Sequence, residues 1–290
     1  MNKVKIRFIS PCAEISFFDP VKKGMNAAAK MVGADVSFVG SEDIDLPVLK
    51  RCFRQALKDG CDGIAISLPD ENFFKEDIKE AQNKGIPVIV FNMDASYGRA
   101  GQLSSVTQDL YKAGFTLGIK VAPHMKVGSK VLVTQHSTNI FALDTRLKGI
   151  QDALKDKKLN WRKVITGNGA DNSYKSVDEE INKDKSRRII LCTGHDDTEG
   201  AGMSVSKLKD KRNYIVAGFD LSERILHYIK ENVILFTIDQ QPYMQGFMPV
   251  IQIFLYRRYK IMPSNIDAGA AVITKDDVDR ILALIKKGYR

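Results

Sequence analysis

The chain has 290 residues, 44% of them hydrophobic and 27% charged, and these ordinary globular values exclude a disordered or fibrous chain. The length allows two domains of usual size, and no apolar run approaches the roughly 18 residues that a transmembrane helix needs. The net charge of +9 is scattered in short basic runs, which favours solvated faces over a nucleic-acid surface, and four cysteines without CxxC spacing argue against a disulfide framework or a zinc site.

Short β-branched runs alternate with amphipathic stretches along most of the chain. The runs predict strands over 5–9, 35–39, 63–68, 88–92, 130–135, 163–166, 188–193, 214–218, 235–239 and 271–274. The stretches between them predict helices over 20–31, 47–58, 71–83, 110–122, 143–155, 174–183, 198–208, 224–230, 241–257 and 275–286. Strand and helix in this alternation indicate an α/β fold with parallel sheets covered by helices on both faces.

The two halves of the chain repeat each other. Residues 20–28 match residues 145–153, and the predicted first and third strands also recur at an offset of 125. Residues 90–94 match 216–220 at an offset of 126, which aligns Asp94 with Asp220. The repeat predicts two similarly built doubly wound domains, with the last fifty residues adding strand and helix to one or both.

Polar and aromatic side chains gather where the predicted strands end, which is the edge of a parallel sheet that binds ligands. Amides and carboxylates hydrogen-bond vicinal hydroxyls, and an aromatic ring packs on the C–H face of a sugar, so two such sites would enclose a small polyol. Structural alternatives stay open: Asp196 and Asp197 fit a helix start, and Phe17 and Phe18 fit a core. The candidates are Ser10, Phe17, Phe18, Asp70, Asn92, Asp94, His136, Ser137, Asn139, Arg146, Asn168, Asp171, Asn172, His195, Asp196, Asp220 and Gln240.

Motifs of catalysis are not found. The chain has no GxSxG, HExxH, GxxxxGK[ST] or intact GxGxxG, so we expect no catalytic residue and no cofactor. We also expect no metal, because the adjacent residues His195, Asp196 and Asp197 seldom converge on one ion. An α/β enzyme remains an alternative, with His136 or His195 as its base.

Several stretches, the motifs GIPVI–(N/D)xDA and GFD…TIxQxP among them, resemble the type I periplasmic binding proteins of the ribose-binding class over essentially the whole chain. The resemblance implies two lobes joined by three crossovers, one of residues 1–107 with 241–266 and the other of 108–240 with 267–290. The stretches are residues 16–36, 62–70, 85–95, 107–114, 145–154, 216–246 and 270–279.

The resemblance also implies ligand contacts. Phe17 and Phe18 match the aromatic pair that stacks on the sugar. Asn92 and Met93 stand where ribose binders have an aspartate and an arginine, which argues against plain ribose; Asp94 is expected to compensate. The remaining implied contacts are Gln108, Asn139, Arg146, Asn172, His195, which takes the place of an asparagine, and Asp220 and Gln240, which match directly.

The function that the resemblance implies is that of an extracytoplasmic solute-binding protein. Such a protein captures a monosaccharide or related polyol in the interlobe cleft, closes on it and delivers it to an ABC importer, without catalysis. The alternative is a sugar-sensing module that signals to a membrane histidine kinase or chemoreceptor; a regulator that has lost its DNA reader and a furanosyl autoinducer as ligand are further options. Since residues 4–9 already form a strand pattern, we expect either a cytosolic protein or a mature form without its signal peptide.

Overall fold

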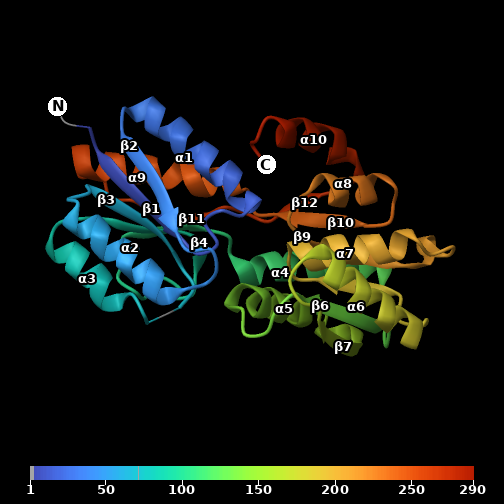
Figure 1. Cartoon of the computed structure of the whole chain (residues 1–290). Helices are drawn as coiled ribbons and strands as arrows, with labels where there is room; N and C mark the ends of the chain where they lie inside the picture. The colour runs from blue at the N-terminus through green and yellow to red at the C-terminus, as the bar shows by residue number, and fades with distance from the viewer. Residues whose placement is uncertain (1–2, 71) are drawn as a thin grey trace. The chain divides into compact units, whose positions relative to one another are not determined.

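The computed structural model describes residues 3–70 and 72–290, which divide into two compact units. Unit 1 comprises residues 1–108, 241–268 and 288–290, and unit 2 comprises residues 109–240 and 269–287. In each unit, helices alternate with the strands of one sheet (Figure 1).

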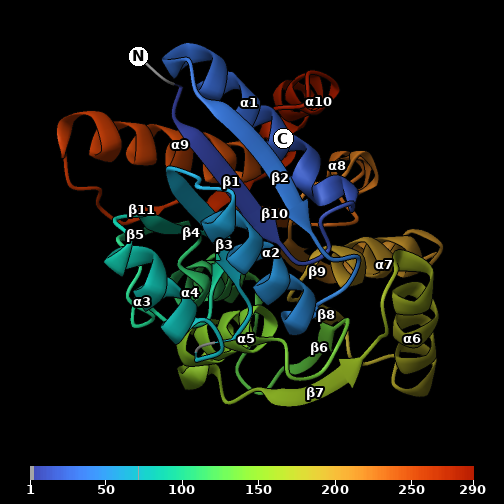
Figure 2. The same cartoon turned by 60° about the vertical axis from the view of Figure 1, so that its left-hand side comes forward.

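Unit 1 contains a six-stranded parallel sheet in the order β11-β5-β4-β3-β1-β2. Helices α1 and α9 pack on one face, and α2 and α3 on the other (Figure 2). The central strand β3 is buried along its whole length, as its apolar sequence predicts. The elements are β1 (Lys5–Ser10), η1 (Ser16–Phe18), α1 (Asp19–Val32), β2 (Asp35–Gly40), α2 (Leu46–Lys58), β3 (Gly63–Leu68), α3 (Lys75–Asn83), β4 (Val88–Asp94), β5 (Ser104–Thr107), α9 (Pro242–Tyr259) and β11 (Ile266–Asp267).

Unit 2 contains a six-stranded sheet in the order β12-β10-β9-β8-β6-β7, in which only β12 runs antiparallel to its neighbour. The strands are β6 (Lys130–Gln135), β7 (Asn160–Ile165), β8 (Ile189–Cys192), β9 (Ile215–Phe219), β10 (Phe236–Asp239) and β12 (Ala271–Ile273). The helices are α4 (Leu110–Val121), η2 (Ala122–His124), α5 (Phe141–Ala153), η3 (Lys155–Lys157), α6 (Ala170–Lys183), α7 (His195–Ser206), η4 (Lys211–Asn213), α8 (Glu223–Lys230), η5 (Lys275–Asp277) and α10 (Val278–Lys286).

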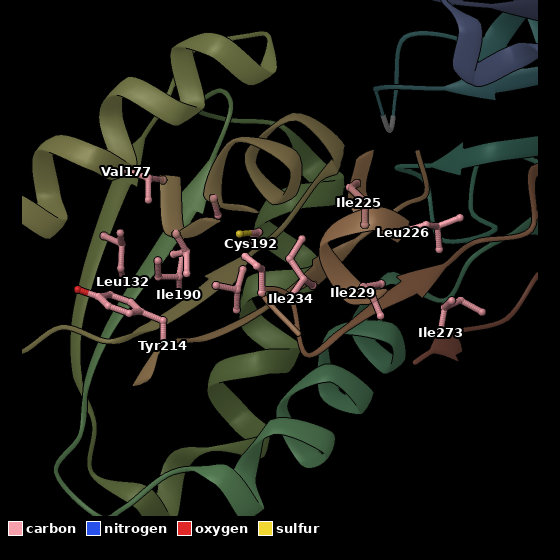
Figure 3. Packing of buried hydrophobic residues seen from close by; sticks show 14 of the residues in the cluster. Leu132, Val177, Ile190, Cys192, Tyr214, Ile225, Leu226, Ile229, Ile234 and Ile273 are labelled. Carbon is pink, nitrogen blue, oxygen red and sulfur yellow. The ribbon is translucent and has the colours of Figure 1, made fainter. Parts of the chain in front are cut away.

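The core of unit 2 lies on both faces of its sheet. On one face, Leu132, Ile190 and Cys192 pack against side chains of α6, α7, α8 and α10 (Figure 3). On the other face, α4 and α5 cover the alternate strand residues, such as Val131 and Leu191. Successive strand residues thus enter opposite cores, which is the geometry that apolar strands without alternation predict.

Glycines of the predicted repeat allow two helix pairs to pack closely. A Cβ atom on Gly24 of α1 would lie 2.1 Å from the backbone oxygen of Tyr243 on α9. A Cβ atom on Gly149 of α5 would lie 2.2 Å from the backbone oxygen of Tyr111 on α4. The repeated glycine is therefore a packing requirement, because any larger side chain would push the paired helices apart.

The predicted fold class is confirmed: two α/β units, each with a doubly wound, largely parallel sheet. Two short strands, β5 and β11, were not predicted, and β7 begins three residues before the predicted strand at 163. The helix predicted over 71–83 begins at Lys75, and residue 71 lies outside the described residues. Residues 288–290, expected in the C-terminal lobe, belong to unit 1, where the ring of Tyr289 lies 5.2 Å from that of Tyr243.

Candidate functional site

Arg146 is the central charged residue at the carboxyl edge of the unit 2 sheet. Its side chain is 4% exposed and extends from α5, where its Nη1 donates a hydrogen bond of 3.0 Å to the carbonyl oxygen of Thr193. The guanidinium lies 4.2 Å from the ring centroid of Phe219, and Nη1 lies 3.9 Å from Oδ2 of Asp220. The guanidinium is therefore held by a peptide carbonyl, an aromatic face and a carboxylate at once.

Asp220 follows β9 in a left-handed conformation, with φ of 69°. Its Oδ1 accepts a hydrogen bond of 2.6 Å from Nε2 of Gln240, and both residues are 8% exposed. Asp220 and Gln240 stand directly after neighbouring parallel strands, so the fold brings them together although 20 residues separate them. The structure thus places three predicted site residues, Arg146, Asp220 and Gln240, in one cluster.

Asp197, on the first turn of α7, extends this cluster into the interior. Its Oδ2 accepts hydrogen bonds from Oγ1 of Thr134 at 2.9 Å and from the backbone N–H of Thr193 at 2.8 Å. The side chain is fully buried, and Oδ1 has no hydrogen-bond partner among the described residues. Burial raises the pKa of Asp197 to about 6, against the lowering effect of these hydrogen bonds and of the nearby His136.

These contacts form a relay that fixes Arg146. Asp197 accepts from the N–H of Thr193, and the carbonyl oxygen of Thr193 accepts from Arg146, which faces Asp220. Burial lowers the pKa of Arg146, while the charges of Asp220 and Asp197 raise it. From the sequence, a helix start is the alternative to a functional role for Asp197, and no metal site with His195 and Asp196 is expected. The fold shows that Asp197 turns inward and joins the cluster through Thr193.

His195 lies at the start of α7, beside the cluster. Its Nδ1 is 3.1 Å from Oδ1 of Asp196, and its side chain is 40% exposed. Burial lowers the pKa of His195, but the hydrogen bond to Asp196 and the charges of Asp220 and Glu199 outweigh it, so the pKa is raised overall. The hydrogen bond to His195 lowers the pKa of Asp196, whose Oδ2 also accepts from the N–H of Gly169 at 2.7 Å.

Asn139 and Asn172 are exposed, and no contact described in the structure joins either of them to Arg146 or Asp220. Asn139 adopts a left-handed conformation with φ of 58° in the segment before α5. Nδ2 of Asn172 donates 2.8 Å to the backbone oxygen of Asn168, so this amide organises the loop before α6. Oδ1 of Asn168 in turn accepts a hydrogen bond of 3.1 Å from Nδ1 of His136.

The register of the sheets corrects the predicted pairing of Asp94 with Asp220. Phe91 pairs with Val106 in unit 1, and Phe219 pairs with Ile238 in unit 2. The residue after each phenylalanine is left-handed, with φ of 63° at Asn92 and 69° at Asp220. Asn92 is therefore the counterpart of Asp220, and Gln108 and Gln240 correspond because each stands two residues beyond the paired Val106 or Ile238.

Asp94 organises its own loop, and the compensating role expected of it rested on the wrong alignment. Its Oδ1 accepts from the N–H of Ser96 at 3.0 Å, and its Oδ2 accepts from the N–H of Gly98 at 3.2 Å and from Gln102 at 2.8 Å. Three residues downstream of Asp94 thus donate to one carboxylate, which is the usual role of an aspartate in a tight loop.

Asn92 instead supplies the polar group at the carboxyl edge of unit 1. Its Nδ2 donates 3.1 Å to Oε1 of Gln245, a fully buried residue of α9 that sequence analysis did not identify. The hydroxyl of Ser67 lies 3.5 Å from Oδ1 of Asn92. Gln108, the predicted polar contact at the end of this unit, is 3% exposed.

The phenylalanine pair divides between two environments. Phe18 is 3% exposed and packs into the core of unit 1, with its ring centroid 5.6 Å from that of Phe38. Phe17 is half-buried and meets Phe18 edge to face at 5.1 Å. The alternative that these phenylalanines belong to the core therefore holds for Phe18. Phe17 is the ring of the pair that remains partly exposed.

The two carboxyl edges differ in charge at positions that are equivalent in the repeat. A Cβ on Gly114 would meet the backbone oxygen of Arg146, and a Cβ on Gly246 would meet that of Val21, so Val21 is the counterpart of Arg146. Where unit 2 has Arg146 and Asp220, unit 1 has Val21 and Asn92. The edge of unit 2 thus offers charged groups, and the corresponding positions of unit 1 are neutral.

The described residues contain no group of three or more His, Cys, Asp or Glu side chains placed to hold a metal ion. None of the helices in the described part of the chain combines the length and apolar character needed to cross a membrane. Each carboxyl edge by itself offers hydrogen-bond donors and acceptors, and that of unit 2 adds the charges of Arg146 and Asp220, groups that suit a polar ligand rich in hydroxyls.

Comparisons with known proteins agree with this architecture. The chain is 27% identical over 293 residues to the xylose/arabinose-binding protein XylF of Sulfolobus acidocaldarius, covering 96% of this chain and 73% of XylF. A carbohydrate transporter from Acidothermus cellulolyticus 11B, solved with myo-inositol, has the same fold, with a TM-score of 0.85, 24% identity and 100% coverage of both chains. A chain of the XylFII-LytSN complex matches with a TM-score of 0.84 and 23% identity, covering 96% of this chain and 100% of that chain. The model of the periplasmic binding protein domain matches residues 6–255, and the chain therefore belongs to this family.

Proposed function

We propose that this protein binds a monosaccharide or a related polyol and performs no reaction on it. The observation that carries the proposal is the cluster of Arg146, Asp220 and Gln240, in which a carboxylate, a guanidinium and an amide meet at the carboxyl edge of one sheet. Adjacent sugar hydroxyls each donate and accept, so such a cluster can satisfy several of them together, with charge-assisted bonds at Asp220 and Arg146.

Unit 1 contributes neutral groups in this proposal. Asn92 supplies an amide where a ribose binder resembling this chain would have a carboxylate, and Phe17 supplies the partly exposed ring. A neutral amide with an aromatic face suits an uncharged sugar better than a sugar acid or a sugar phosphate. The names of the relatives, which refer to xylose, arabinose and myo-inositol, support a pentose or a polyol of similar size.

In its biological role, we infer an extracytoplasmic receptor that delivers its sugar to an ABC importer. The family, and the transporter named in the inositol-bound structure, support this role. A ligand that contacts both units stabilises a closed arrangement only by its higher affinity for that arrangement. The second candidate is a sensor that signals sugar occupancy to a membrane kinase. The similarity to a chain of the XylFII-LytSN complex supports this second hypothesis.

The test begins with thermal unfolding of the purified protein in the presence of pentoses, hexoses, inositols and sugar alcohols. A compound that binds only the folded state raises the melting temperature by mass action, and we expect one or two close stereoisomers to do so. If none does, and no small molecule is released on denaturation, the proposed sugar function is wrong.

The site is tested separately with Asp220→Asn, measured by calorimetric titration with the sugar that the screen identifies. Loss of a charge-assisted hydrogen bond costs about 1.5–3 kcal/mol, so we expect affinity to fall about tenfold to a hundredfold. The matched control is Asp279→Asn, an exposed aspartate of α10 that pairs with Lys230. Equal sugar affinity of Asp220→Asn and the wild type would refute this site while leaving sugar binding intact.

A further inference from the structure

The positive charge of the chain gathers at one edge of unit 2, although its basic runs are scattered in the sequence. The segments that enter β6, β7, β8, β9 and β10 lie at residues 126–130, 154–159, 184–188, 207–214 and 231–235. Together they hold twelve lysines and arginines and four acids, a net charge of +8 out of the +9 of the whole chain. Because these five strands are parallel neighbours, their amino ends meet at the same edge of the sheet.

The acids of this edge neutralise few of its basic groups. Four of the twelve are paired: Asp184 lies 3.0 Å from Lys130 and 3.8 Å from Arg187, Asp210 lies 3.2 Å from Arg188, and Glu231 lies 3.8 Å from Lys211. In contrast, Lys158, Lys185 and Lys209 are exposed, and in the described part of the chain no acid lies within ion-pair distance of them. The edge therefore carries an uncompensated field rather than a network of closed ion pairs.

The composition of the edge indicates the class of partner. Nine of its twelve basic residues are lysines, which act as mobile point charges, whereas planar arginine is the residue that grips one phosphate in a bidentate way. Large apolar side chains are nearly missing: of those exposed in the described residues, only Val127, 69% exposed, lies in these segments. Binding would thus depend on charge and not on insertion of apolar groups.

We propose that this amino-terminal edge of unit 2 docks on the headgroups of an anionic lipid bilayer. Five parallel strands spaced about 4.8 Å apart present their entering loops over roughly 19 Å, an array wide enough to face many headgroups at once. Lysines near an anionic membrane surface each add attraction that falls off within a Debye length. The carboxyl edge with Arg146 and Asp220 lies at the opposite ends of the same strands, so docking leaves the sugar contacts of unit 2 uncovered. This inference goes beyond the proposed function and does not depend on which ligand is bound.

The experiment is co-sedimentation of the whole protein with vesicles. We expect binding to vesicles of 30% phosphatidylglycerol in phosphatidylcholine, none to pure phosphatidylcholine, and release between 50 and 500 mM NaCl. The triple variant Lys158→Glu, Lys185→Glu and Lys209→Glu should lower the partition coefficient at least tenfold. A control variant with the same change of charge, Lys30→Glu, Lys75→Glu and Lys79→Glu, alters exposed lysines of α1 and α3 in unit 1 and should bind vesicles nearly as the wild type does.

Three results would overturn the proposal. Equal losses in both triple variants would mean that net charge alone attracts the protein and that this edge has no special role. Absence of binding to phosphatidylglycerol vesicles would exclude a lipid partner. Tighter binding to heparin or to DNA than to vesicles, at matched salt, would assign the edge to a polyanionic polymer instead. Circular dichroism and thermal unfolding of each variant establish that it is folded before the comparison.

Discussion

Replacing Asp197 with asparagine tests the energetics of the buried relay. In the folded chain the pKa of Asp197 is raised to about 6 from its ordinary 3.8, mainly by burial. Between these two values the folded state holds a proton that the unfolded state has lost, so stability falls as pH rises through this window. A difference of about two pKa units corresponds to a loss of about 3 kcal/mol in unfolding free energy. This loss is complete above pH 7 and is absent well below pH 4.

The variant Asp197→Asn does not titrate and keeps an oxygen that can accept from Thr134 and from the N–H of Thr193. Its amide also places an unpartnered N–H₂ where Oδ1 now lies, at a cost of about 1–3 kcal/mol that does not change with pH. The informative quantity is therefore the difference in unfolding free energy between the variant and the wild type, followed over pH. We expect this difference to move in favour of the variant by about 2 kcal/mol between pH 4.5 and pH 7.5, because part of the change has already occurred at pH 4.5.

The assay is urea unfolding followed by circular dichroism at four pH values between 4.5 and 7.5. Asp196→Asn is the matched control, because the hydrogen bond to His195 lowers the pKa of the neighbouring Asp196. A lowered pKa contributes stability that is lost only as pH falls below the ordinary value of 3.8, so the titration of Asp196 should leave the difference between this control and the wild type nearly constant from pH 4.5 to pH 7.5. A pH-independent difference for Asp197→Asn would show that the carboxylate is not held uncharged by burial, and the reasoning would fail.

Four further substitutions follow from the packing. Arg146→Ala removes the cation that faces the buried carboxylate of Asp220, and we expect unfolding free energy to fall by about 3 kcal/mol in urea titrations; a change below 1 kcal/mol would contradict the proposed burial of this pair. Gly149→Ala forces a methyl group into the backbone of α4, and we expect a loss of about 1–3 kcal/mol, measured as a lower melting temperature. Phe18→Ala should cost about 3–5 kcal/mol of stability because its ring is core, whereas Phe17→Ala should cost less and mainly weaken sugar binding; the reverse order would restore Phe18 as a ligand contact.

Most of the architecture was predictable because local patterns carry it. Alternating β-branched and amphipathic segments predicted the α/β class, and the repeated glycines of α1 and α5 predicted two similar units. The strands β5 and β11 escaped prediction because they are two to four residues long, and β5 begins with Ser104 and Ser105. Such strands form by hydrogen bonding to a neighbour that is distant in sequence, so no local signal announces them.

At the candidate site, sequence alone determined which residue types follow the strands, and so indicated Asp220, Gln240 and Arg146. Strand register decided the rest. Sequence similarity paired Asp94 with Asp220, but the strand pairing and the left-handed backbone select Asn92, two residues earlier, because register is fixed by pairing between strands that are distant in sequence and not by residue likeness. The inward turn of Asp197 depends on its hydrogen bonds to Thr134 of β6, 63 residues away in the sequence, and to the N–H of Thr193, directly after β8. The basic edge of unit 2 likewise exists only in three dimensions, since five segments spread over 110 residues meet there because their strands run parallel in one sheet.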